Sequence, residues 1–335
     1  MSNQPKKLNS STIQKLVVIG TLIGMYVFFS FFGNNFFSTA TLVNILDSSY
    51  YIGFLALGIT FVIITGGIDL SIGTIMMCSA LIGGVAYNVW NWPIAWALVL
   101  IVGLATLFGL MNGLMVAKLK LPPFIATLGT QMVTMGFGAI VSKVTTMRFP
   151  TVTDPDGWFK FVFFKTKNGF PIGAVWLGSF LLISYIILNK TRLGRYTFAI
   201  GSNEEATRLS GVKVDRWKIM VYVISGFFSG LAAIVYATAY TSIVPGTGNG
   251  LELSAIAGTV IGGTSLSGGI GTVSGTIIGV FIMSVLKQGL MSMNLQGQWQ
   301  TFFTGIVVIC AVLLDIYRNK KANQVKKISQ HVFKY

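Results

Sequence analysis

Charged side chains are scarce in this sequence. Asp, Glu, Lys and Arg make up 10% of its 335 residues, against roughly a quarter in an ordinary soluble domain. Hydrophobic residues make up 53%, and the mean hydropathy is +0.74, so most helices must be apolar on every side. A water-soluble globular protein is therefore excluded. The length has room for roughly ten membrane-spanning helices of about 20 residues each.

Catalytic and nucleotide-binding motifs are also missing. The only histidine, His331, follows the last apolar run, and no H-E-x-x-H motif or Ser/His/Asp set is present. A G-x-x-x-x-G-K-[ST] loop for ATP is absent as well. The sequence therefore predicts a chain that is not an enzyme and binds no metal or cofactor. Any energy source must be another subunit or an ion gradient.

Ten apolar runs predict an all-α polytopic membrane protein with glycine-broken segments. The predicted transmembrane domain covers 16–317, between an N-terminal tail at 1–15 and a basic tail at 318–335. The runs lie near 16–33, 43–65, 72–89, 94–116, 124–142, 171–189, 218–240, 251–267, 271–291 and 299–317.

The basic residues predict how the chain is oriented in the membrane. The net charge is +15, but the Lys and Arg residues gather in alternate connections rather than on one face, which argues against a nucleic-acid partner. With a cytoplasmic N-terminus, 18 of them lie inside, 5 lie outside, and Lys287 falls within an apolar run. The distribution predicts that both termini are cytoplasmic, with a long outer loop at 143–170 and a long inner loop at 190–217.

The inner loop contains a signal for the start of a helix. The segment Ser202–Glu205 has the capping-box pattern, in which the serine and the second glutamate each satisfy a free N–H group. The two glutamates suit a first turn, Arg208 follows one turn later, and Gly211 can end the helix in a left-handed conformation. A helix of about nine residues is predicted. It is either an ordinary surface helix or the contact site for a soluble partner that drives the membrane domain.

Two segments in different halves of the chain share a glycine-rich pattern. Gly66–Gly73 and Gly262–Gly269 have Gly, Gly, Leu, Ser and Gly at the same five of eight positions. Paired breaks of this kind indicate broken helices around a translocation pathway. Tight corners at the membrane surface are the alternative.

Two carboxylates belong to these broken regions. Asp69 lies within the first glycine segment, where it either caps the helix that follows or faces the pathway. Glu252 follows a flexible stretch at 245–250 and opens the eighth apolar run. It is either a first-turn partner of the helix dipole or a residue at the outer mouth of the pathway.

A polar stripe follows one face of the fifth apolar run. Thr127, Gln131 and Thr134 are spaced at i, i+4 and i+7, which places them together on a helix. Asn112 adds a polar group to the fourth run. Each residue is suited either to hydrogen bonding between helices or to contact with a hydroxylated solute.

Four ordered blocks resemble the permease subunit of ribose/xylose/arabinose-type ABC importers. The blocks are Gly66–Gly73, Pro122–Thr130, Ala199–Gly211 and Val260–Gly269, and the resemblance runs from about residue 40 to Asp315. The chain departs from the pattern at Ser254, where members often have Asp, and at Gln288, where Asn often precedes the glycine. These departures weaken any transfer of sugar identity.

The resemblance implies an ATP-driven importer in a bacterial cell membrane. Two permease copies would form the pore, an extracytoplasmic binding protein would deliver a monosaccharide, and partner ATPase subunits would hold ATP and Mg and drive alternating access. A secondary sugar or polyol transporter is the alternative, although such a protein usually needs intramembrane carboxylates or histidines for ion coupling, and only Asp69 is well placed.

The resemblance and the motifs together define two sets of candidate residues. The predicted ATPase-coupling loop comprises Gly201, Ser202, Asn203, Glu204, Glu205, Arg208, Leu209 and Gly211. The predicted pathway and gating residues are Gly66, Gly67, Asp69, Ser71, Asn112, Thr127, Gln131, Glu252, Thr264 and Ser265.

Overall fold

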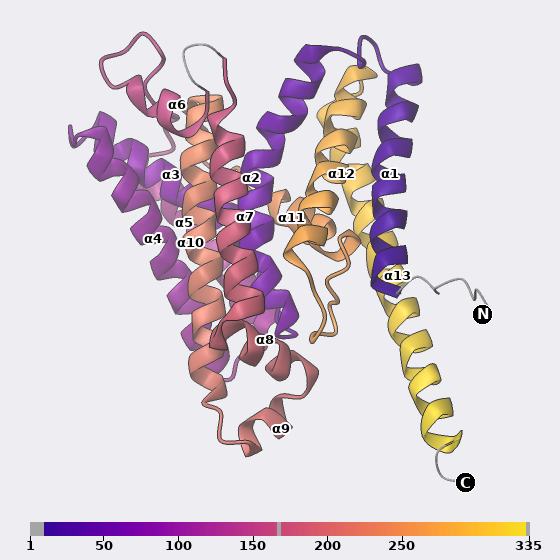
Figure 1. The fold of residues 1–335 in the computed structure, drawn as a ribbon. Coiled ribbons are helices and arrows are strands. Elements are labelled where there is room, and N and C mark those ends of the chain that lie inside the picture. Colours follow the sequence, from indigo (N-terminus) through magenta and orange to yellow (C-terminus); the bar gives the residue numbers. More distant parts are fainter. Residues whose placement is uncertain (1–9, 166–168, 333–335) are drawn as a thin grey trace.

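The structure is a computed structural model that describes residues 10–165 and 169–332. Lys6, Lys7, Lys167 and Lys334, which entered the charge count, lie outside these residues. Helices occur at all ten predicted apolar runs (Figure 1): α1 Ser10–Phe32, α2 Thr39–Ile64, α3 Ile72–Asn88, α4 Ile94–Ala117, α5 Pro123–Val141, α7 Ile172–Lys190, α10 Val214–Tyr240, α11 Leu251–Ile261, α12 Val273–Ser292 and α13 Gly297–Val332.

Seven of these helices are long and apolar enough to cross a membrane. The other apolar segments are shorter and cover Leu16–Phe32, Ile72–Asn88 and Leu251–Ile261. The structure is therefore mostly helical, with several helices able to span a membrane, as the sequence predicted. The number of crossings and the orientation of the termini stay predictions.

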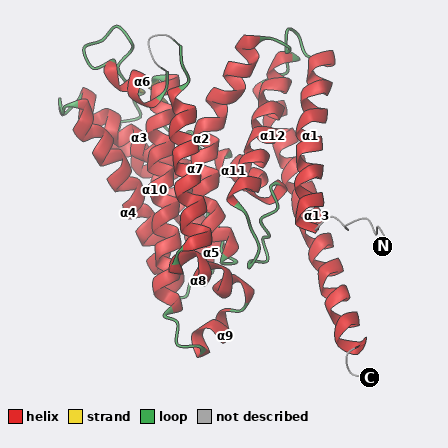
Figure 2. Ribbon diagram, viewed as in Figure 1, coloured by secondary structure: helices red, strands yellow, loops and turns green. Residues whose placement is uncertain are grey.

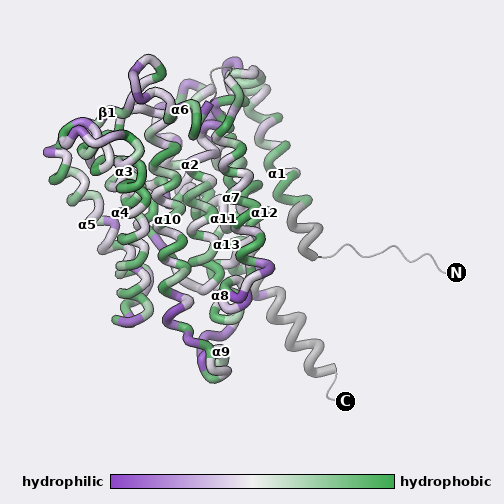
Figure 3. The backbone as a smooth tube through the Cα atoms, turned by 60° about the vertical axis from the view of Figure 1, so that its left-hand side comes forward, coloured by the Kyte–Doolittle hydropathy of each residue, from purple (hydrophilic) through white to green (hydrophobic). Residues whose placement is uncertain are grey.

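The connections contain short elements that the apolar pattern did not predict. α6 (Trp158–Phe163) lies in the predicted outer loop, and α8 (Arg192–Ser202) and α9 (Glu204–Leu209) lie in the predicted inner loop. The two-residue strands β1 (Met147–Arg148) and β2 (Ser242–Ile243) pair antiparallel. α6 and α9 lie at opposite ends of the bundle, and hydrophilic residues are concentrated toward these ends (Figures 1 and 3).

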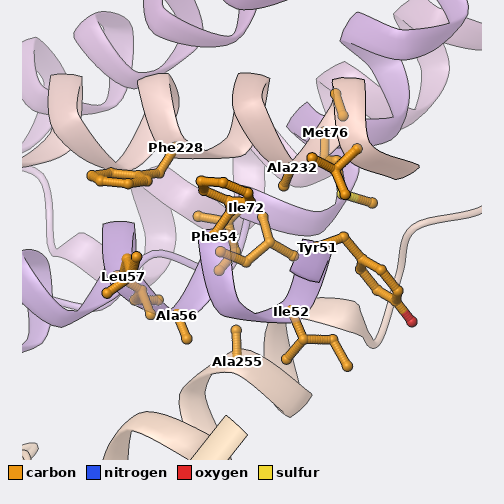
Figure 4. Packing of buried hydrophobic residues seen from close by; sticks show 14 of the residues in the cluster. Tyr51, Ile52, Phe54, Ala56, Leu57, Ile72, Met76, Phe228, Ala232 and Ala255 are labelled. Atoms are coloured by element: carbon orange, nitrogen blue, oxygen red, sulfur yellow. The ribbon is translucent and has the colours of Figure 1, made fainter. Parts of the chain in front are cut away.

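The core is built around α2, because 94% of the residues in its most apolar 18-residue segment are buried. The aromatic ring of Phe54, on α2, packs against that of Phe228 on α10, and Ala232 belongs to the same cluster (Figure 4). α10 also packs closely on α4, because a Cβ added to Gly109 would lie 2.9 Å from the Cα of Gly226. Small residues at such crossings let helix backbones approach where no water drives association.

The boundaries of the last predicted runs differ from the structure. α11 ends at Ile261, six residues before the predicted end of the eighth run at 267. Gly263 then takes a positive φ of 100°, a conformation that stops a helix and suits glycine. At the other extreme, α13 does not end near Tyr317 but continues to Val332. The basic tail predicted at 318–335 is therefore helical over most of its length.

Candidate functional site

The first glycine motif, Gly66–Gly73, folds around a fully buried carboxylate. Asp69 Oδ1 accepts hydrogen bonds from the backbone N–H of Ser71 at 3.1 Å and from its hydroxyl at 2.6 Å. Its Oδ2 accepts from the hydroxyl of Ser225 on α10 at 3.0 Å. Ser71 precedes α3 and makes no side-chain cap. Asp69 thus orders the turn that leads into the helix and does not bind the free N–H groups of the first helical turn.

The hydrogen bonds of Asp69 continue into two further helices. Asn112 Nδ2 on α4 donates to the hydroxyl of Ser71 at 2.8 Å, and its Oδ1 accepts from Thr130 on α5. The five residues of this cluster are at most 5% exposed: Asp69, Ser71, Asn112, Thr130 and Ser225. The cluster therefore ties α10, α4 and α5 to the turn between α2 and α3. Sequence analysis missed both Ser225 and Thr130. The spacing of Thr130, at i+3 from Thr127, places it on the same helical face as the polar stripe, whereas Ser225 is a single hydroxyl in an apolar helix with no such signal.

The polar stripe on α5 faces its neighbours, as its spacing predicted. Thr134 donates to the hydroxyl of Thr74 on α3 at 2.8 Å, whereas Thr127 donates to carbonyls of its own helix, those of Pro123 at 2.9 Å and Phe124 at 3.5 Å. Gln131 Nε2 donates to Asn249 Oδ1 at 2.9 Å. The stripe thus bonds to α3 on one side and to the loop before α11 on the other.

Glu252 completes a second polar group at the start of α11. Its Oε1 accepts from Gln131 at 3.3 Å, and both carboxylate oxygens lie 3.0 Å from the backbone nitrogen of Gly250. The side chain is 3% exposed. Gly250 is the N-cap of α11, and Glu252 satisfies its N–H group from within the first turn, as the acidic residue of a capping box does. Of the two predicted roles, the first-turn role fits this geometry.

The second glycine motif, Gly262–Gly269, is held by a different helix. Asp315 on α13 accepts hydrogen bonds from the Ser265 hydroxyl and from the backbone N–H of Leu266, both at 3.0 Å. Ser265 in turn accepts from the N–H of Ser267 at 3.2 Å. The neighbouring hydroxyl of Thr264 is buried and has no hydrogen-bond partner among the described residues.

The two glycine motifs meet the end of α8. The backbone N–H of Gly269 donates to the carbonyl of Ile64, the last residue of α2, at 2.8 Å. Gly201 fits against the same place, because an added Cβ there would overlap the Ile64 carbonyl and approach the backbone nitrogen of Gly269. Gly268 packs against both segments as well, because an added Cβ there would lie 2.8 Å from the carbonyl oxygen of Gly201 and 3.0 Å from the nitrogen of Gly66. Figure 2 shows the extended loop between α11 and α12 that carries the second motif.

The predicted capping box is wrong in its register. Ser202 is the last residue of α8, and Asn203 is the N-cap of α9, with its Oδ1 accepting from the N–H of Ala206 at 2.9 Å. α9 has six residues, fewer than expected, because α8 occupies the positions before it. The end of the helix is as predicted: Gly211 follows with φ +81°.

Ion pairs hold α9 against the start of α10. Glu204 pairs with Arg208 at 3.1 Å and with Lys218, and Arg208 also reaches Asp215 at 3.1 Å. Burial alone would raise the pKa of Glu204, but hydrogen bonds and charge attraction from Lys218 and Arg208 outweigh it and lower this pKa. Leu209 is 85% exposed at the end of the helix. α9 thus exposes an apolar side chain while ion pairs hold the helix in place.

Comparison with known proteins identifies clear relatives. The model of a protein family described as "Branched-chain amino acid transport system / permease component" matches residues 41–312. A ribose import permease of Escherichia coli (strain K12) is 38% identical over 86% of this chain and 88% of its own. A fructose import permease of Rhizobium meliloti is 33% identical over 91% and 86%, and a xylose transport system permease of E. coli K12 is 31% identical over 92% and 93%. No solved structure gave a match.

Proposed function

The chain belongs to the branched-chain amino acid transport system / permease component family, and we propose that, within this family, it is the membrane-spanning subunit of an ATP-driven importer for a monosaccharide. The observation that carries the proposal is the similarity to ribose, fructose and xylose permeases over most of the chain. A permease component transports rather than catalyses, so ATP hydrolysis belongs to a partner. The same similarity favours this function over a secondary transporter.

The coupling role of α8 and α9 rests on how they are attached. α9 is braced by ion pairs and exposes Leu209, which suits a contact with an ATPase subunit. Gly201, two residues before the cap of α9, is packed against the end of α2 and the second glycine motif. A displacement of α9 would therefore reach the end of α2 and the second motif through backbone contacts, without a flexible side chain between them. We propose this contact as the route from ATPase to pathway.

The proposed transport mechanism is alternating access in a pore formed with a second copy of the chain. An extracytoplasmic binding protein would deliver the sugar, and ATPase closure would exchange an outward-facing for an inward-facing cavity. Hydrogen bonds in the pathway should be weak enough for release. Among the predicted pathway residues, Asp69 and Glu252 are both buried and both accept hydrogen bonds from within the protein, so we propose that they support the structure of the pathway.

The proposed topology has ten crossings with both termini in the cytoplasm. It rests on the distribution of basic residues and on the position of α6 and α9 at opposite ends of the bundle. In a Cys310→Ser background, an impermeant thiol reagent should label Lys160→Cys in intact cells and Arg208→Cys only after permeabilisation. The reverse pattern would overturn the orientation.

Transport itself is tested with the whole importer in proteoliposomes. Purified permease, ATPase and binding protein are reconstituted without an ion gradient, and uptake of D-ribose, D-fructose and D-xylose is measured with and without ATP. Uptake of at least one sugar that requires ATP supports the proposal. Uptake that requires an ion gradient instead would support the secondary transporter, and no uptake of any of the three would reject the sugar assignment.

A further inference from the structure

A small cavity of about 170 Å³ lies between α2, α11, α12 and α13. Seven of its lining residues are polar: Tyr51, Asn249, Ser254, Lys287, Gln300, Thr301 and Thr304. They come from four different helices and the loop before α11. Polar side chains from several elements that converge on one cavity in an apolar bundle are the general signature of a ligand site.

Lys287 is the charged member of this set. It lies on α12, within the apolar part of the chain, and its ammonium donates to the Tyr51 hydroxyl at 2.8 Å. Among the described residues no carboxylate lies within ion-pair distance of it. A lysine has three N–H donors, and two of them have no protein partner in the part of the chain that the structure describes. An ionisable group held in this way within a membrane domain indicates function.

Tyr51 is held rigidly next to this lysine. Its ring is 1% exposed and meets the rings of Tyr236 and Tyr240 edge to face, with centroids 5.2 and 6.0 Å away. The Lys287 ammonium also lies 5.5 Å from the centre of the Tyr51 ring. Figure 4 shows the Tyr51 hydroxyl turned away from the apolar side chains around it. The aromatic packing thus fixes where the polar pair can donate.

The cavity adjoins the polar residues that the sequence placed on the pathway. Asn249 lines it and accepts from Gln131, and Gly250 lines it and donates to Glu252. Tyr51 is the thirteenth of the 26 residues of α2, so the cavity sits halfway along the central helix. It therefore lies at mid-depth in the bundle, next to the predicted pathway residues Gln131 and Glu252.

We propose that this cavity is a contact site for the monosaccharide during translocation, with Lys287 and Tyr51 binding sugar hydroxyls. The polar wall is completed by Asn249, Ser254, Gln300, Thr301 and Thr304. The inference rests on the proposed function and names the site of that function. Its volume is below the roughly 300–1,000 Å³ of pockets for drug-sized ligands, which suits a single sugar ring. Sugar hydroxyls both donate and accept, which matches this mixed lining.

Occlusion of the cavity is the first test. Thr304→Trp places a large ring from α13 into it, whereas Ile306→Trp, two residues along the same helix and 40% exposed, points elsewhere. Uptake of D-ribose, D-fructose and D-xylose is measured with the whole importer. Thr304→Trp should lower uptake of the transported sugar at least tenfold with normal membrane levels, and Ile306→Trp should stay within twofold of wild type. Equal uptake by both variants overturns the site.

Protection from a thiol reagent is the second test, and it changes the cavity only slightly. Ser254→Cys in a Cys310→Ser background is exposed to a membrane-impermeant thiol reagent, with and without each sugar; Cys78 is buried and stays unlabelled. Labelling that a transported sugar slows at least threefold supports the site. A cysteine that never reacts, or whose reaction no sugar slows, overturns it. Failure of the proposed function is distinguished by absent uptake in the wild-type importer.

Discussion

The two glycine motifs share five of eight residues, yet the structure uses them differently. In both, the fourth residue accepts a hydrogen bond from the N–H of the sixth: Asp69 from Ser71 at 3.1 Å, and Ser265 from Ser267 at 3.2 Å. The first motif contains its own carboxylate, and its sixth residue is fully buried. The second obtains a carboxylate from Asp315 on α13, and its sixth residue is exposed.

The difference lies in what each turn is attached to. The first motif is tied by side chains to α4, α5 and α10 in the core, so it is a fixed corner. The second is tied to the peripheral helix α13 and, through the Gly269 N–H, to the end of α2 beside Gly201. We infer that the second motif is the one placed to move with α8 and α9. The predictions below test this asymmetry.

The largest effect is expected at the buried carboxylate of the first motif. Asp69→Leu leaves the Ser71 N–H and the Ser225 hydroxyl without an acceptor, at a cost of about 1–3 kcal/mol for each buried group. The variant should lose most of its folded yield in detergent, measured by size-exclusion chromatography. Asp69→Asn retains an acceptor oxygen and should keep much of the yield and of the transport. Complete loss of transport by a well-folded Asp69→Asn protein would show that the negative charge itself is required.

The next largest effect is expected where α8 meets the second motif. Gly201→Val forces α8 away from the Ile64 carbonyl, since no space exists for a side chain there. We expect at least a tenfold loss of sugar uptake together with weaker ATPase association in pull-down experiments. The control is Gly178→Val on α7, where an added Cβ meets no atom within 4 Å. Normal uptake by Gly201→Val would remove this contact from the coupling route.

A matched pair of serines compares the motifs directly. Ser71→Ala removes a buried hydroxyl that bonds both Asp69 and Asn112, so we expect a loss of about 1–3 kcal/mol of stability. Ser267→Ala, at the same position of the second motif, changes an exposed residue whose polar partners water can replace, so we expect a smaller loss than for Ser71→Ala. Thermal unfolding of the two variants in one detergent gives the comparison. Equal shifts in Tm would mean that both turns are fixed corners.

The smallest effect is expected in α9. Glu204 has a lowered pKa, so its ion pairs contribute stability above the unfolded pKa of about 4.3, and this contribution disappears as the pH falls through the folded value. Glu204→Gln should increase local opening of 204–209 about twofold at pH 7, because exposed pairs contribute about 0.2–1 kcal/mol. Hydrogen exchange, corrected for its intrinsic rate, measures this. The difference from wild type should shrink below pH 4, and a constant difference would assign it to something other than charge.

The sequence predicted elements better than it predicted contacts. Ten apolar runs gave ten helices, because apolar residues in a run are sufficient to predict helices in a membrane. The six residues at the end of the eighth run were assigned to a helix wrongly, since Gly262–Gly269 is apolar enough to extend the pattern but takes positive φ angles. The cap of α9 was placed one residue early, because Ser202 and Asn203 are both good caps and only the packing of α8 chooses between them.

Composition and the apolar runs by themselves determined that this chain is a membrane protein, because both follow from which residues are present and how they are spaced. The permease type was indicated by the resemblance of four ordered blocks to a known family. Which polar residues meet was decided only by tertiary structure. Tyr51 and Lys287 are separated by 236 positions and form their hydrogen bond because α2 and α12 cross. Gly201 gains its importance in the same way, since the absence of a side chain matters only where another backbone occupies the space.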